Sequence, residues 1–289
     1  MSLPGRFLSI GGQRVFYHRS GRGRPVVLIH GFAVSHWCFR HIIPGLAAGN
    51  DVIAIDLPGG GESDRPPPAD YRYDAPAYME TVLGVLDALG LEKASLVGHS
   101  MGGGVALYTA ARRPERVDRL VVIDPLCYPY RLPPEGRALL VPYLGPALFQ
   151  ALFSRPVVRS YMQRRVYREP ALATEEWVDY IWERLNRPGG IQALHSSLRF
   201  CHEPSVIART VRAIRSPTLI VWGDGDKIFP ASFGPRLRVD ITGAELHIVR
   251  ECGHAPPEER PDEVVKVVAG FLAADHPRGR RPGVMAVTP

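Results

Sequence analysis

The chain has 289 residues, of which 45% are hydrophobic and 22% are charged, and this composition excludes a protein that is disordered throughout. A chain of this length buries a sizeable core, as one large α/β domain or as two small domains. The formal net charge is +6, but the basic residues are spread along the chain without interleaved aromatic clusters, so we expect no nucleic-acid partner.

The N-terminal half predicts an alternation of strands and helices. Two β-rich segments flank Gly11-Gly12 in RFLSIGGQRVFYHR, which is typical of a hairpin with a two-residue loop. Three short apolar runs follow: PVVLIHG, DVIAIDLPGGG and ASLVGHS. Helical stretches come after them in HWCFRHIIPGLA, YMETVLGVLDALG and GGGVALYTAARRP, and VDRLVVID predicts a further strand. Nearly continuous apolar runs suit parallel strands that helices cover on both faces.

The alternation breaks between residues 126 and 215, where short helical segments rich in leucine and aromatic residues replace the strands. Strands return with PTLIVWGDGD and AELHIVREC, and a helix is predicted from Pro261, where Asp262 and Glu263 favour a helix start. We therefore expect an α/β fold with a doubly wound, mostly parallel sheet and an inserted helical cap. The predicted division is a core in residues 1–125 and 216–275, a helical cap in 126–215 and a flexible tail in 276–289.

Ser100 lies where the apolar run LVGHS meets the helical stretch, in the pentapeptide Gly98-His99-Ser100-Met101-Gly102. A sharp strand-to-helix turn strains its central residue and crowds the positions two before and two after, where glycine removes the colliding side chains. The strain projects the hydroxyl at the carboxyl edge of the sheet, beside a backbone N–H and a helix N-terminus. This context makes Ser100 a candidate nucleophile.

A serine hydroxyl needs a base, and the chain has 10 histidines. His254 is the favoured base, because it lies in a loop between the last predicted strand and the last helix, where a side chain reaches over the sheet edge. His99 is adjacent to Ser100, but strand alternation directs its side chain away from the attack site, so we expect it to pack. His30 suits a role in supporting its own loop.

The base needs a carboxylate that holds its tautomer. Asp224 and Asp226 follow one strand, and Asp124 ends another, so all three occupy carboxyl ends of strands. Asp224 is also suited to a turn, as aspartate commonly is. The residues alone leave the choice of acid open.

These landmarks resemble the α/β-hydrolase superfamily with a helical cap. HGF at residues 30–32, DLPGGGESDRP at 56–66, GHSMGG at 98–103, WGDGDKIFP at 222–230 and ECGH at 251–254 match its motifs in order. The chain order Ser, Asp, His is also the one expected of that fold.

The resemblance implies that Ser100 is the nucleophile, His254 the general base and then acid, and Asp226 the orienting carboxylate, with Asp124 as the fallback acid. It implies an oxyanion hole formed by the backbone N–H groups of Phe32 and Met101. Three glycines would support these groups by permitting close backbone approach: Gly31, Gly98 and Gly102. The acids of DLPGGGES are expected to be structural.

The predicted reaction is hydrolysis of a carboxylic ester of a small to medium apolar substrate through an acyl-enzyme. Relatives that open epoxides or displace halide place Asp where Ser100 stands, which disfavours those reactions. The alternatives are carbon–carbon bond hydrolysis of diketone ring-cleavage products, lactone hydrolysis and cofactor-free perhydrolysis. FAVSHW lacks the extra glycine-proline signature of the carbon–carbon hydrolases, which lowers that alternative. A non-catalytic ligand-binding protein on the same fold is the alternative from another class.

We expect no metal and no cofactor, because the four cysteines lie far apart and form no C-x-x-C pair; buried free thiols are favoured. The sequence has no apolar run of 18 residues and no signal-peptide core, so we expect no membrane span and a cytoplasmic protein. The expected partner is a small apolar molecule, and the sequence does not determine the oligomeric state.

Overall fold

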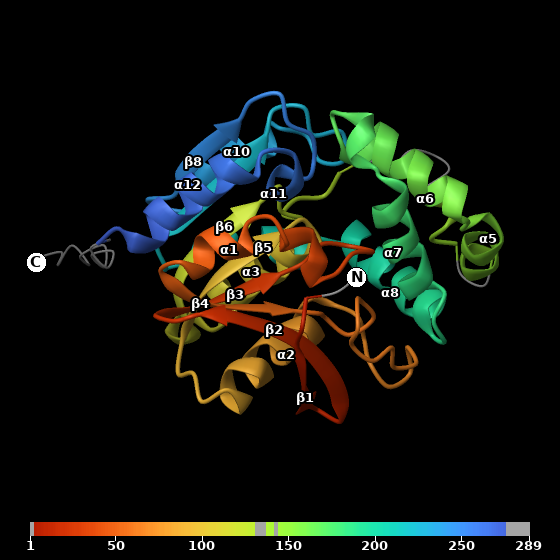
Figure 1. Ribbon diagram of the computed structural model, residues 1–289, viewed down its shortest axis with the longest axis horizontal. Coiled ribbons are helices and arrows are strands. Elements are labelled where there is room, and N and C mark those ends of the chain that lie inside the picture. Colours follow the sequence, from red (N-terminus) through yellow and green to blue (C-terminus); the bar gives the residue numbers. More distant parts are fainter. Residues whose placement is uncertain (1–2, 131–136, 142–143, 276–289) are drawn as a thin grey trace, which may run out of the picture.

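The computed structural model describes residues 3–130, 137–141 and 144–275 (Figure 1). The predicted tail, 276–289, lies outside the described residues. Eight strands form one sheet in the order β1-β2-β4-β3-β5-β6-β7-β8. Their bounds are β1 Arg6–Ile10, β2 Gln13–Gly21, β3 Arg24–Ile29, β4 Asn50–Ile55, β5 Ala94–His99, β6 Val117–Ile123, β7 Thr218–Gly223 and β8 Glu245–Val249.

The sheet is antiparallel only at its N-terminal edge, where β2 pairs with β1 and β4. The predicted hairpin is present: Gly11 and Gly12 join β1 to β2 with φ angles of 55° and 82°, the conformation that favours glycine in two-residue hairpin loops. Strands β3 to β8 pair in parallel. Every residue of β4, β5 and β7 is buried, because helices cover both faces of the sheet as their continuous apolar sequences predict.

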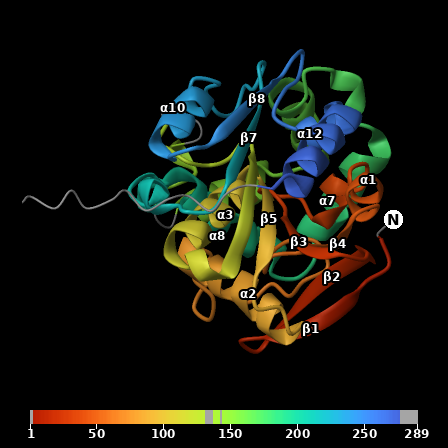
Figure 2. The same cartoon turned by 90° about the vertical axis from the view of Figure 1, so that its left-hand side faces the viewer.

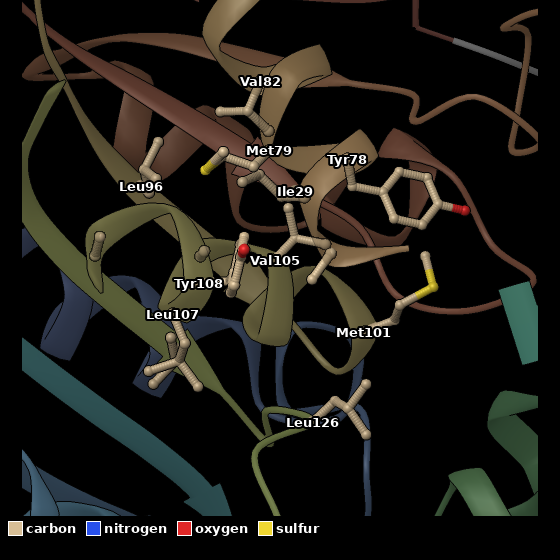
Figure 3. Packing of buried hydrophobic residues seen from close by; sticks show 14 of the residues in the cluster. Ile29, Tyr78, Met79, Val82, Leu96, Met101, Val105, Leu107, Tyr108 and Leu126 are labelled. Carbon is tan, nitrogen blue, oxygen red and sulfur yellow. The ribbon is translucent and has the colours of Figure 1, made fainter. Parts of the chain in front are cut away.

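The helices that pack on the sheet cover both of its faces, with α3 and α12 on opposite sides in Figure 2. Alternate residues of a strand belong to two apolar clusters: in β3, Val27 and Ile29 belong to one cluster, and Val26 and Leu28 belong to the other. Figure 3 shows Ile29, Leu96 and Val105 among the side chains of the first. The helix bounds are α1 Ile43–Ala47, α2 Ala75–Ala88, α3 Met101–Arg112, α10 Phe233–Asp240, α11 Pro256–Glu259 and α12 Pro261–Ala273.

Two details differ from the sequence prediction. The stretch expected to form one helix after β3 forms a 3₁₀ turn, His36–Phe39, and then α1, where a proline in the first turn marks the new start because it lacks an N–H donor. Helix α10 was not predicted; its sequence, FGPRLRVD, has a glycine and a proline and only a weak apolar stripe.

The chain between β6 and β7 is helical in its described part. Figure 1 shows α5, α6, α7 and α8 together on one side of the sheet, and residues of these helices contribute to both apolar clusters. Their bounds are α5 Leu144–Leu152, α6 Arg155–Tyr161, a π-helix Met162–Val166, α7 Glu175–Leu185, α8 Gly190–His202 and α9 Ser205–Ala208. The boundaries of a separate cap, 126–215, remain a prediction. None of the helices in the described part of the chain combines the length and apolar character that a membrane span needs.

Candidate active site

Ser100 forms the whole connection between β5 and α3. Its backbone has φ 54° and ψ −119°, a conformation that a non-glycine residue adopts only under strain. The turn is held from both sides: the Ser100 N–H donates to the carbonyl of Ile123 at 2.9 Å, and its own carbonyl accepts from Leu126 N–H at 2.9 Å and Gly104 N–H at 3.1 Å. Strands β5 and β6 therefore fix the residue that carries the hydroxyl.

Three glycines pack the turn against its neighbours. A Cβ atom on Gly98 would lie 2.4 Å from the carbonyl oxygen of Gly102, and one on Gly102 would lie 2.1 Å from the carbonyl oxygen of Ile29. A Cβ on Gly31 would lie 3.1 Å from the Cβ of Ser100. Real Cβ atoms do not approach backbone oxygens so closely, so positions 98 and 102 require glycine. Gly31 allows the HGF loop to lie against Ser100.

The structure brings Ser100, His254 and Asp226 together from three separate parts of the chain. Nε2 of His254 lies 2.8 Å from Oγ of Ser100, and Nδ1 lies 2.8 Å from Oδ2 of Asp226. Because an ionised carboxylate only accepts, Nδ1 carries the hydrogen and Nε2 is free to accept from the serine. Ser100 is 7% exposed and His254 3% exposed, so both hydrogen bonds are shielded from water.

Asp226 is itself held in place. Its Oδ1 accepts from the N–H groups of Ile228 and Phe229 at 2.7 and 3.1 Å, which leaves Oδ2 for the histidine. Asp224, the other acid after β7, instead accepts from Cys252 N–H at 3.3 Å and lies 3.8 Å from Arg250. Of the two, only Asp226 reaches the imidazole.

Asp124, the fallback acid, lies beside this group without bonding to His254. It follows β6 directly, has φ 43° and is completely buried. Its Oδ1 accepts from Gly223 N–H at 2.9 Å. One possible metal-ligand atom from each of Asp124, Asp226 and His254 lies within 4.8 Å of the other two. Such donors can also hold a cation, but both ring nitrogens of His254 are already hydrogen-bonded to Ser100 and Asp226.

The His254 loop, residues 252–255, is bound by a glutamate that the sequence reasoning missed. Oε1 of Glu259 accepts from the N–H groups of Gly253 at 2.8 Å and Ala255 at 3.3 Å, and Oε2 accepts from Arg168 N–H at 2.8 Å. The His254 N–H donates to the carbonyl of Val166 at 2.7 Å. The loop is therefore joined by hydrogen bonds to residues 166–168. The sequence feature that could have predicted these contacts is the position of Glu259, five residues after the histidine.

Two further histidines surround the site in supporting positions. Nε2 of His99 lies 2.7 Å from the carbonyl oxygen of His254, so it donates there. His99 thus contacts the loop of the base, which the expected packing role did not include, because strand alternation does not locate a distant loop. His30 accepts from Leu57 N–H at 3.0 Å through Nε2, so its Nδ1 donates to Gly31 O at 2.7 Å and supports the HGF loop as expected. Burial lowers the pKa of both rings.

The acids of the DLPGGGES segment are structural in this arrangement. Asp56 is completely buried and accepts from the backbone and ring nitrogen of His36 at 2.7 and 2.9 Å. Glu62 pairs with Arg184 and Arg187, both at 2.6 Å, and so links this segment to α7 and the turn after it. The four cysteines are free and buried, as expected.

Aromatic rings lie next to the base. Phe229 meets the His254 ring edge-on, with 5.2 Å between centroids, and Tyr130 meets Phe229 at 5.1 Å. The Tyr130 hydroxyl lies 3.2 Å from Nδ1 of His202, whose pKa burial lowers to about 4. Two arginines of the helical segment pair with acids: Arg155 with Glu175 and Asp179, and Arg168 with Glu251. The imidazole therefore has an apolar neighbour, Phe229, in addition to its polar partners Ser100 and Asp226.

The fold and this site define a hydrolase on a doubly wound sheet. The model of the α/β hydrolase fold family matches residues 24–261. The chain belongs to this family.

Three comparisons place it among known members. The chain is 32% identical over 277 residues to 2-hydroxymuconate semialdehyde hydrolase of Pseudomonas sp. strain CF600, with 93% of this chain and 94% of the relative covered. It is 30% identical over 272 residues to the uncharacterized hydrolase YugF of Bacillus subtilis strain 168, with 93% and 98% covered. A mutant of the meta-cleavage product hydrolase CumD of Pseudomonas fluorescens IP01 superimposes with a TM-score of 0.80 at 31% identity, covering 93% of this chain and 97% of that chain.

Proposed function

We propose that this hydrolase cleaves carboxylic esters of apolar acids through an acyl-enzyme on Ser100. The observation that carries the proposal is the pair of 2.8 Å hydrogen bonds that joins Ser100, His254 and Asp226. Nε2 of His254 takes the proton of Oγ while Oγ bonds to the carbonyl carbon of the ester. Asp226 stabilises the imidazolium that forms.

After Oγ has attacked the carbonyl carbon, His254 gives up the proton that it received. The imidazolium of His254 protonates the departing alkoxide, so that the alcohol leaves and the acyl group stays on Oγ of Ser100. A water molecule then gives a proton to Nε2 and attacks the acyl carbon, and the same proton returns to Oγ as the carboxylic acid is released. A metal or an organic cofactor is not part of this scheme.

The oxyanion that forms on the carbonyl would accept hydrogen bonds from the N–H groups of Phe32 and Met101. Neither group donates to an acceptor within the described residues, and Met101 is the first residue of α3, where such groups are unpaired. Phe32 follows Gly31, whose backbone lies against the Cβ of Ser100. Each donor of this kind is worth about 3 kcal/mol of transition-state stabilisation.

An uncharged acyl group is supported by the aromatic surroundings of the base. Phe229 contacts the His254 ring and Tyr130 contacts Phe229, so these two rings offer an apolar acyl group a surface to pack against. A carboxylate on the substrate would need a cation beside the site to offset its desolvation. An apolar acyl chain needs none.

Carbon–carbon bond hydrolysis is the second candidate, and the relatives favour it. Several of them are named for hydrolysing dienoates, such as 2-hydroxy-6-oxo-2,4-heptadienoate, at 32% identity in Pseudomonas putida. The same serine and histidine would serve that reaction. The substrate of such an enzyme is a carboxylate, which distinguishes it experimentally from a neutral ester.

The test combines covalent labelling with a substrate panel. Intact-mass analysis after treatment with a fluorophosphonate is expected to show one label per chain, lost in Ser100→Ala. Turnover of p-nitrophenyl esters of increasing acyl length is then compared with turnover of a 2-hydroxy-6-oxo-dienoate. We expect ester kcat/KM to exceed that for the dienoate by at least about tenfold, or about 1.4 kcal/mol in activation free energy. A dienoate that is hydrolysed faster would select the second candidate, and folded protein without label would contradict both.

A further inference from the structure

The carboxyl group of Asp124 has no function in the relay just described, although it lies closest to it. It is carried by β6, the strand that pairs with both β5 and β7, so it reaches the same edge of the sheet as Ser100 and Asp226. Its N–H donates to Val221 O at 3.0 Å, and its φ of 43° holds the residue in a region that aspartate enters at a cost. The backbone is thus fixed in a strained conformation that turns this residue at the end of β6.

One oxygen of this carboxyl group is left without a partner. Oδ1 accepts from Gly223 N–H at 2.9 Å. Oδ2 is fully buried and has no hydrogen bond to the described residues. Buried polar atoms are nearly always paired, so an orphan oxygen with Asp226 and His254 nearby requires an explanation.

We propose that Asp124 is a reserve carboxyl group of the His254 relay, a positioning residue whose free oxygen takes over the imidazole Nδ1–H when Asp226 is neutralised or removed. The inference rests on the proposed function, because it concerns the same histidine. A carboxyl oxygen of Asp124 already lies within 4.8 Å of a ring nitrogen of His254.

The charge distribution explains why Asp226 holds the imidazole in the resting protein. The groups that face Asp124 are Asp226, His254, Glu259 and Cys252. Burial, followed by the charge of Asp226, raises the pKa of Asp124 well above its ordinary range. Two carboxylates this close share one negative charge. The charge is placed on Asp226, which accepts two backbone N–H bonds where Asp124 accepts one.

Removal of Asp226 reverses this preference. The charge of Asp226, which together with burial keeps Asp124 protonated, is lost, and the Asp226 carboxyl group no longer accepts from Nδ1 of His254. Asp124 then releases its proton to solvent and accepts from Nδ1. Alanine is the informative substitution, because asparagine at position 226 can donate its own N–H to Nδ1 and hold the wrong tautomer.

The experiment measures kcat for a p-nitrophenyl ester from about pH 6 to pH 10 in four variants: Asp226→Ala, Asp124→Asn, their combination, and Asp118→Asn as the matched control. Asp118 lies at the opposite end of β6 and pairs with Lys93 and Arg119. We expect Asp226→Ala to retain at least about tenfold more activity than the combination, which should fall by about 10⁴-fold as for loss of a lone orienting carboxylate. The kcat of Asp226→Ala should rise with pH as Asp124 ionises, and this rise should be absent from the combination. Asp118→Asn should stay within about twofold of the unsubstituted protein.

The outcomes separate this inference from the proposed function. If Asp226→Ala is as inactive as the combination, or lacks the rise with pH, Asp124 is not a reserve group. If Ser100→Ala keeps full activity, the proposed function fails irrespective of Asp124. Thermal unfolding establishes that each variant is folded at the assay temperature; should Asp226→Ala not fold, Asp226→Ser is subject to the same comparison.

Discussion

The His99 ring lies against the backbone of His254: its Nε2 is 2.7 Å from the His254 carbonyl oxygen, and the two rings are 5.3 Å apart between centroids. His99, the residue before the proposed nucleophile, thus holds the backbone of the proposed base, across 155 positions of sequence. Burial, and then the proximity of His254, lowers the pKa of His99 to about 3. His99 is therefore neutral at ordinary pH and donates this hydrogen bond as an uncharged group.

Acid should destabilise the protein through His99. The unfolded chain binds a proton on this residue below pH 6.5, whereas the folded chain resists it down to about pH 3. Stability is therefore present above pH 6.5 and is lost as the pH falls through this window, by about 1.4 kcal/mol per pH unit for this group. Burial lowers the pKa of His202 to about 4, so this residue adds to the loss of stability between pH 6.5 and about pH 4. Urea unfolding between about pH 7 and pH 5 measures the slope.

The control for this prediction is His99→Gln, which keeps an amide donor near the carbonyl of His254 but does not titrate. It should lower stability at neutral pH and reduce the dependence on pH between about pH 7 and pH 5. A variant with the same slope as the unsubstituted protein would show that other groups cause the acid sensitivity.

Glu259 should affect turnover more than substrate binding. Glu259→Gln replaces one of two accepting oxygens by a donor that faces an N–H group of Gly253 or Arg168. The His254 loop would shift, and a displacement of about 1 Å of a catalytic group costs about 10²-fold in rate. We expect kcat to fall by about 10- to 100-fold with KM within about threefold, measured on a p-nitrophenyl ester.

Glu258→Gln is the neighbouring control for Glu259. The Glu258 carboxylate accepts from Arg40 at 2.8 Å, and within the described residues this side chain has no hydrogen bond to the His254 loop; of Glu258, only the backbone N–H donates to that loop, at Ala255 O. The Glu258→Gln variant should have a lower unfolding temperature than the unsubstituted protein, while its kcat stays within about threefold of the unsubstituted value. Equal losses of kcat in both variants, at a temperature where both are folded, would mean that Glu259 stabilises the fold without positioning His254.

The sequence was sufficient to predict that Ser100, His254 and one of the aspartates after the neighbouring strands meet, because each follows an apolar run that ends at the same edge of a parallel sheet. The resemblance to the α/β-hydrolase superfamily favoured Asp226. Geometry was needed for the choice between Asp226 and Asp124, since both satisfy that pattern and only one bonds to Nδ1. The contact of Glu259 with Arg168 could not be predicted, because the carboxylate and the backbone N–H group lie 91 positions apart. Strand and helix periodicity carries no information on which distant loops touch.

Packing of the serine turn gives a further prediction on stability. A Cβ on Gly102 would lie 2.1 Å from Ile29 O and 2.4 Å from His30 O, both of which are backbone atoms that cannot rotate away. Gly102→Ala should therefore destabilise the protein by about 3 kcal/mol or more, because β3 or α3 must move. Gly270, exposed in α12, has no atom within 4 Å of its would-be Cβ. Gly270→Ala should stabilise by about 0.5–1 kcal/mol through helix propensity. Urea unfolding measures both, and shifts of the same sign would contradict the packing argument.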